Sequence, residues 1–174
     1  METNILDQYY SIKSGEVKLG QITEESNPGS LMQMLLCLLR TVYNVHQHSH
    51  WLCSSPQFYS NHLLFERLYK DAAERVDSLA EKTIGLFGND SLDYKVQLDI
   101  MQGMIKDFIS DDHIQNSLKA ELKFIEKATE TYNKLKETGN LSLGNDDLIM
   151  SSINQAEVSV YLLKQAGAKE NKEE

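Results

Sequence analysis

Apolar residues recur at helical spacing over two long segments in the first half of the chain. In residues 31–51 they stand three or four positions apart, until the sequence Ser-Ser-Pro at 54–56 breaks the pattern. Residues 57–88 continue with helical spacing, contain no proline and end at a Gly-Asn pair. The pattern predicts two long helices, and Ser30 is placed to cap the first of them.

Three more amphipathic segments follow. A short one covers residues 94–109, and a longer one runs from a capping site at 110–112 to residue 136. The last segment extends to residue 168, with Asn145 or Asp146 placed to cap it. Four long helices, with one short helix between the second and third, predict an all-α fold: a four-helix bundle whose middle connection crosses over.

The length of 174 residues suits one compact domain. Residues 1–28 show little helical periodicity and are expected to form an N-terminal arm. The bundle is then expected over 29–168, followed by a charged tail over 169–174. Only two prolines and nine glycines interrupt the chain, which is consistent with long helices.

The chain is acidic, with a formal net charge of −9 and a pI near 5.0. Its averaged field repels phosphate backbones and anionic membranes, so DNA binding is expected to be weak or absent and cations are the expected partners. The longest apolar run, at 35–39, is too short to span a bilayer, and no basic and apolar leader opens the sequence. Cys37 and Cys53 are too few for a disulfide framework. These features predict a cytoplasmic protein without a membrane segment.

Five residues that can bind metal ions occupy compatible positions on the first two helices. His50 is near the end of the first, and the second carries His62, Glu66, Asp77 and Glu81. The four residues on the second helix point to one side of it. The members of each pair, 62/66 and 77/81, are one turn apart, and the eleven residues from 66 to 77 complete almost whole turns at ~100° per residue. Histidine nitrogens combined with carboxylate oxygens suit iron, manganese or zinc.

The spacing argues against a complete site within one chain. Glu66 and Asp77 are ~16 Å apart along a helix that rises ~1.5 Å per residue, whereas ligand bonds are ~2 Å long. Two copies of this helix that cross antiparallel about a twofold axis would bring the 62–66 pair of one chain to the 77–81 pair of the other. The axis would pass near the two alanines at 72–73, whose small side chains would let the helices approach closely. The sequence therefore predicts a homo-oligomer.

Each candidate ligand also has an ordinary structural explanation. Carboxylates on a long helix usually form a solvated face, and a single histidine is more often structural than a ligand. The joint pattern favours the metal site, because five ligand-capable residues coincide. His46, one turn before His50, is a further candidate for an outer position or a second metal ion, whereas His48 lies ~200° around the helix and is expected to face another surface.

The candidate ligands follow one another at intervals of twelve, four, eleven and four residues: His50-Trp51, His62, Glu66, Asp77 and Glu81. This series resembles that of the Dps family of mini-ferritins, which carries an Ala-His-Trp-like segment, then His-x-x-x-Asp and Asp-x-x-x-Glu. Here Glu66 stands where the family usually has aspartate, and the longer side chain moves the charge by ~1.5 Å. The resemblance extends over most of the chain, including the final helix.

The resemblance implies a ferritin-like bundle with ferroxidase centres between twofold-related chains, each holding one or two iron ions. It also implies a hollow shell of twelve chains that stores ferric mineral, with hydrogen peroxide or dioxygen as the oxidant. Trp51 matches the aromatic residue with which the family quenches oxidising equivalents. Asp147 matches an aspartate that lines an acidic threefold pore.

Three functions are compatible with these features. The leading hypothesis is an iron-binding mini-ferritin that oxidises Fe(II) and protects against oxidative damage. The alternative is a structural or nucleoid-associated shell of the same fold with weakened metal chemistry, against which the acidic ends of the chain argue. A third is an active shell that is attached elsewhere through residues 1–28.

Overall fold

The computed structural model describes residues 27–54 and 56–168, and in this part of the chain all regular structure is helical. The helices are α2 (Pro28–Leu52), α3 (Phe58–Phe87), α4 (Tyr94–Ile105), α5 (His113–Glu137) and α6 (Leu143–Gly167), with the short 3₁₀ turns η2 (Asn89–Ser91) and η3 (Lys106–Phe108). The predicted all-α fold is confirmed. Most of the predicted N-terminal arm and the charged tail over 169–174 lie outside the described residues.

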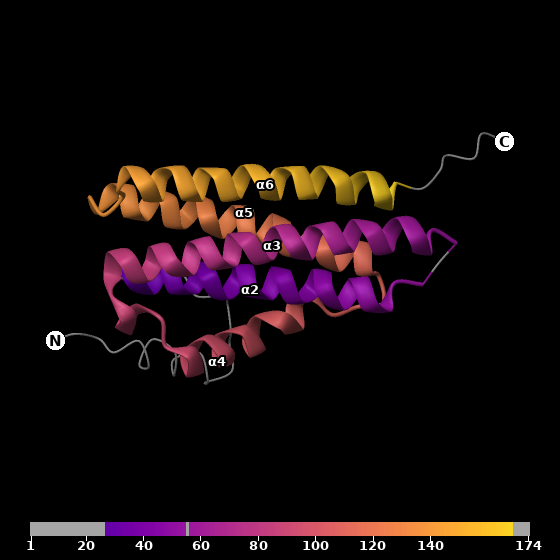
Figure 1. Ribbon diagram of the computed structural model, residues 1–174, viewed down its shortest axis with the longest axis horizontal. Helices are drawn as coiled ribbons and strands as arrows, with labels where there is room; N and C mark the ends of the chain where they lie inside the picture. The colour runs from indigo at the N-terminus through magenta and orange to yellow at the C-terminus, as the bar shows by residue number, and fades with distance from the viewer. Residues whose placement is uncertain (1–26, 55, 169–174) are drawn as a thin grey trace.

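The four long helices form a bundle in which α2 packs on α3 and α5, while α6 packs on α3 and α5. Figure 1 shows the pairs α2–α3 and α5–α6 as two hairpins, and α4 lies across one side of the bundle against α2. Helix α4 carries the chain from the end of α3 back to the opposite end of the molecule, so α3 and α5 run in the same direction (Figure 1). This is the predicted crossover connection.

The core lies between the four helices and extends under α4. Its side chains are apolar at helical spacing, as the sequence pattern predicts. The largest of the fully buried ones include Phe65, Phe124, Met32, Leu36, Leu39, Leu79 and Leu135. Both cysteines are free and buried. In the part of the chain that the structure describes, none of the helices is long and apolar enough to cross a membrane.

Two helix starts differ from the sequence prediction. Helix α2 begins at Pro28 and is capped by Asn27, whose side chain accepts a hydrogen bond from Gly29 N at 2.8 Å, so Ser30 lies inside the helix. Proline suits this first helical position because its fixed φ is already helical and its missing N–H is not needed. Helix α6 is capped by Ser142, which accepts from Asn145 N at 3.1 Å. Asn145, predicted as a cap, is buried in the first turn instead.

Candidate metal centre

The rings of His50 and His62 stack on each other where the end of α2 meets the start of α3. Their centroids are 3.8 Å apart and the ring planes differ by 23°. Each ring also bonds to the other residue's main chain: His50 Nδ1 lies 3.0 Å from the His62 carbonyl oxygen, and His62 Nδ1 lies 3.0 Å from the His50 carbonyl oxygen. Two predicted ligands from different helices are thus held face to face by a reciprocal pair of hydrogen bonds.

These bonds determine which nitrogen of each ring carries the proton. A carbonyl oxygen can only accept, so Nδ1 must be the donor in both histidines. In the neutral ring the lone pair is then on Nε2, which is the nitrogen left to bind a metal ion. An Nδ1–H bonded to a main-chain carbonyl is the arrangement that usually orients metal-binding histidines. The His50 carbonyl accepts this bond readily because it belongs to the last turn of α2, where carbonyl groups lack helical partners.

Aromatic side chains fix the two rings further. Phe58 stacks on His62 with centroids 5.2 Å apart, and Tyr69 and His50 form a T-shaped pair whose centroids are also 5.2 Å apart. Tyr43 in turn contacts Tyr69 edge-on at 6.2 Å. The imidazoles are therefore packed against aromatic rings of α3 and are half-buried. This packing reduces the number of rotamers that they can adopt and preorganises the pair.

Glu66 lies one turn after His62 on α3, and its side chain is 35% exposed. Lys70 Nζ donates to Glu66 Oε1 at 2.6 Å. This hydrogen bond, together with the charge of Lys70, lowers the pKa of Glu66; burial opposes the shift, and the nearby His50 and His62 add to it. Glu66 is therefore a carboxylate in its charged form, close to both histidines.

Asp77 and Glu81 lie on the same helix but do not reach this cluster. Both side chains are exposed, and the eleven residues between Glu66 and Asp77 correspond to ~16 Å of helix. Among the described residues, no three side chains of His, Cys, Asp or Glu converge closely enough to hold a metal ion. One chain thus presents a pair of histidines with a carboxylate beside it and, further along α3, a separate exposed pair of carboxylates.

The alanines predicted to lie at the twofold axis have different surroundings. Ala72 is fully buried in the chain's own core, whereas Ala73 is exposed. Only one of the two is available for close approach by another helix, because neighbouring positions on a helix point ~100° apart. Trp51 is 64% exposed, and Asp147 is exposed near the start of α6. His48, expected to face away from His50, is exposed and forms a T-shaped contact with His113, with centroids 6.4 Å apart.

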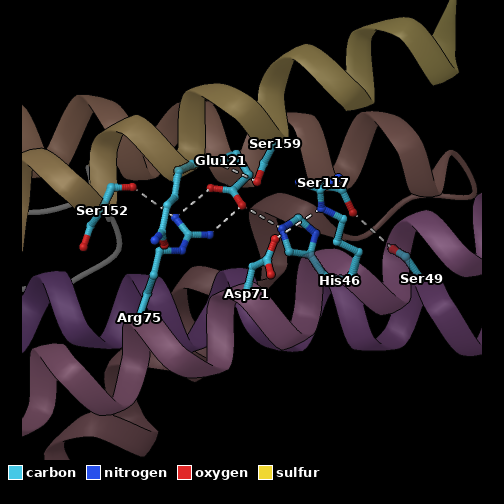
Figure 2. Close-up of polar contacts among 10 residues, drawn as sticks. His46, Ser49, Asp71, Arg75, Ser117, Glu121, Ser152 and Ser159 are labelled. Atoms are coloured by element: carbon cyan, nitrogen blue, oxygen red, sulfur yellow. Dashed lines mark hydrogen bonds and ion pairs between the residues drawn. The ribbon is translucent and has the colours of Figure 1, made fainter.

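A second group of polar residues lies inside the bundle, with one contribution from each long helix. Glu121 of α5 bonds to His46 Nε2 of α2 at 3.0 Å and to Arg75 Nη2 of α3 at 2.8 Å. Arg75 Nη1 also reaches the Ser152 carbonyl oxygen of α6 at 3.4 Å. Figure 2 shows His46 and Arg75 both pointing toward the carboxylate of Glu121. His46 therefore faces the interior of the bundle, where its partner is a carboxylate.

Charge is balanced in this buried network. Burial alone raises the pKa of Glu121, but the hydrogen bond from His46 and the charge of Arg75 outweigh burial and leave the pKa below its ordinary value. The Arg75 guanidinium neutralises the Glu121 carboxylate. A metal ion in the bundle interior would need this same carboxylate as a ligand. Sequence reasoning missed this pair, although both residues interrupt apolar stripes. Arg75 lies between Ala72 and Leu79 on the buried face of α3.

A third polar contact lies near the start of α6. A hydrogen bond with Asp146 raises the pKa of Tyr132, and burial and the charge of Asp146 act in the same direction. Asp146 is half-buried in this contact, whereas its neighbour Asp147 points to solvent. Of these two aspartates, Asp147 is the one whose side chain is exposed on the surface of the bundle.

A ferritin-like domain matches residues 30–143. The DNA protection during starvation protein 2 of Bacillus anthracis is 35% identical over 51 residues, which are 29% of this chain and 35% of that protein. The match thus spans about a third of the relative's length.

Three solved structures have a similar fold. Dps from Thermosynechococcus elongatus has a TM-score of 0.71 and 21% identity, over 83% of this chain and 92% of that one. DpsC from Streptomyces coelicolor has a TM-score of 0.70 and 18% identity, over 82% and 84%. The Dps protein of Vibrio cholerae O1, described as a member of a broad superfamily of ferritin-like diiron-carboxylate proteins, has a TM-score of 0.67 and 19% identity, over 95% and 97%. Because the domain match covers more than half of the chain, the protein belongs to the ferritin-like family, and its fold is that of the Dps-type mini-ferritins.

Proposed function

We propose that this protein is a mini-ferritin that binds Fe(II) between twofold-related chains, oxidises it and stores the ferric product in a hollow shell. His50, His62 and Glu66 of one chain and Asp77 and Glu81 of its mate would bind the iron. The observation that carries the proposal is the reciprocal bonding of the two histidines, which directs both Nε2 lone pairs away from the main chain.

The donor set fits this substrate. Imidazole nitrogens and carboxylate oxygens together bind iron well, and the lowered pKa of Glu66 keeps that carboxylate charged in neutral solution. The exposed carboxylates of Asp77 and Glu81 need a second chain, because helical rise separates them from Glu66. Each α3 helix carries two half-sites on one face. Two antiparallel α3 helices would therefore form two complete centres, one on each side of the twofold axis.

Iron is the electron donor in the proposed reaction. In the overall reaction, one hydrogen peroxide molecule accepts one electron from each of two Fe(II) ions and two protons from solution, and is converted into two water molecules. Dioxygen is the alternative oxidant. The protein's part is to hold iron with positions open for the oxidant and to keep the carboxylate charged. The exposed Trp51, adjacent to His50 in sequence, would take up stray oxidising equivalents.

The assembly proposed is a closed shell of twelve chains, about 240 kDa for a chain of 19.8 kDa. The exposed Asp147 would line the pores through which Fe(II) passes into an acidic interior. We place the protein in the cytoplasm, where its two cysteines stay reduced. Light scattering that gives a stable monomer in neutral buffer would contradict the intersubunit centre, since one chain holds only part of it.

Single-turnover oxidation tests the function. Fe(II) is mixed with hydrogen peroxide and the assembled protein, and the ferric product is followed by absorbance. We expect rapid oxidation by the parent protein, loss of the rapid phase in His62→Ala, and no loss in His48→Ala, a control of the same residue type on the far side of α2. Equal rates for His62→Ala and the parent would favour a shell without this metal chemistry.

A further inference from the structure

Lys70 occupies one oxygen of the candidate ligand Glu66. The two residues are one turn apart on α3, and the ammonium nitrogen lies 2.6 Å from Oε1. A lysine ammonium carries a full positive charge at neutral pH and binds a carboxylate oxygen much as a cation does. Only Oε2 of Glu66 is then left for a metal ion beside His50 and His62.

A neighbouring ion pair on the same helix, between Arg67 and Asp71, includes no candidate ligand. Arg67 Nε lies 3.6 Å from Asp71 Oδ2, also one turn apart and also exposed. Neither member of that pair is among the candidate ligands, and its distance exceeds that of a normal hydrogen bond. The helix thus offers two ion pairs of similar spacing and exposure, of which one includes a candidate ligand.

We propose that Lys70 fills the second cation position of the centre and limits it to one tightly bound metal ion per chain. This inference rests on the proposed function, because it assumes that Glu66 binds metal. A carboxylate that bridges two metal ions uses both oxygens, and the Lys70 ammonium already takes one of them. A second divalent ion at that place would also meet the positive charge of Lys70 at close range.

Zinc binding to the assembled protein tests the inference, because Zn²⁺ has no redox chemistry and its stoichiometry does not depend on iron oxidation. All variants carry His48→Gln, so that the His48 and His113 rings do not form an additional zinc site. Zinc that stays bound during dialysis against zinc-free buffer is counted per chain. The variants are Lys70→Gln, which removes the charge, Lys70→Arg, which retains it, and Arg67→Gln as the matched control.

We expect one zinc ion per chain in the His48→Gln parent, in Lys70→Arg and in Arg67→Gln, and two in Lys70→Gln. One ion in Lys70→Gln, with the assembly size unchanged by light scattering, would overturn the inference and leave the proposed centre intact. Two ions in the parent would overturn it as well. No retained zinc in any variant would instead contradict the proposed metal centre, and the role of Lys70 with it.

Discussion

Arg75 and Glu121 form a buried ion pair between α3 and α5, with Nη2 2.8 Å from Oε1 and both side chains almost completely shielded from solvent. The guanidinium also lies over the ring of Phe124, 5.3 Å from its centroid. Such a pair adds little net stability, because removing two charges from water offsets much of their attraction. It is nevertheless sensitive to change, since the loss of one partner leaves the other charge buried alone.

The first prediction follows from this asymmetry. Glu121→Gln should lower the free energy of unfolding by about 3–5 kcal/mol, because Arg75 would stay charged without a counter-ion. The double variant Arg75→Met/Glu121→Leu should lose much less, since it removes both charges and refills the space with apolar atoms. Urea unfolding at a fixed chain concentration measures both. A double variant less stable than Glu121→Gln would show that the pair itself stabilises the bundle.

The second prediction concerns the stability of the fold at acidic pH. The pKa of Glu121 is lower in the folded chain than its ordinary value of 4.5, so the unfolded chain takes up the proton more readily. The stabilisation that this carboxylate gives is therefore fully present above its ordinary pKa and is lost as the pH falls through its folded value. Melting temperatures measured from neutral pH downwards should fall less steeply below pH 4.5 for Arg75→Met/Glu121→Leu than for the parent. Parallel curves would assign the acid sensitivity to other carboxylates.

The third prediction separates the two nitrogens of His62. In His62→Asn the amide places an N–H near the position of Nδ1, so the bond to the His50 carbonyl can be kept while the nitrogen at the Nε2 position is lost. We expect zinc affinity to fall at least tenfold with little change in melting temperature. His62→Ala should lose affinity and, in addition, about 0.5–1.5 kcal/mol of stability from the missing hydrogen bond. Zinc binding by His62→Asn at the parent's affinity would show that Nε2 of His62 is not a ligand of the centre.

The fourth prediction concerns DNA. With a net charge of −9, the protein should bind duplex DNA weakly at physiological salt, and its affinity should depend only slightly on salt concentration. Gel shifts over a series of salt concentrations measure both. Tight binding with a steep salt dependence would indicate a concentrated basic surface and favour a nucleoid-associated shell.

Helical periodicity was sufficient to predict the bundle and the order of its helices, because apolar spacing directly reports which face is buried. It also grouped His62 with Glu66 and Asp77 with Glu81 on α3, and the structure leaves all four outside the core. The stacking of His50 on His62 was not predictable, because it depends on how two helices approach each other rather than on spacing within one. The short bond between Glu66 and Lys70 was readable from their four-residue interval but was not used.

Other features depended on tertiary packing. Ala72 was assigned to an intersubunit contact, yet it faces the core, because its azimuth differs by ~100° from that of Ala73. Arg75 and Glu121 each interrupt an apolar stripe on a different helix. The pattern of one helix does not show that such a polar residue has a partner on another helix. Whether the half-sites on α3 meet across a twofold axis stays a prediction, since it concerns a second chain.

Mixed shells test that central claim most directly. His62→Ala and Asp77→Ala should each abolish rapid Fe(II) oxidation, because each removes a ligand from every centre. In a dimer of one chain of each kind, one centre carries both lesions and the other is intact. Co-assembly in equal amounts should therefore restore about a quarter of the parent activity, the share of intact centres under random pairing. No recovery in shells shown by two affinity tags to contain both chains would contradict the intersubunit centre, even if both single variants were inactive.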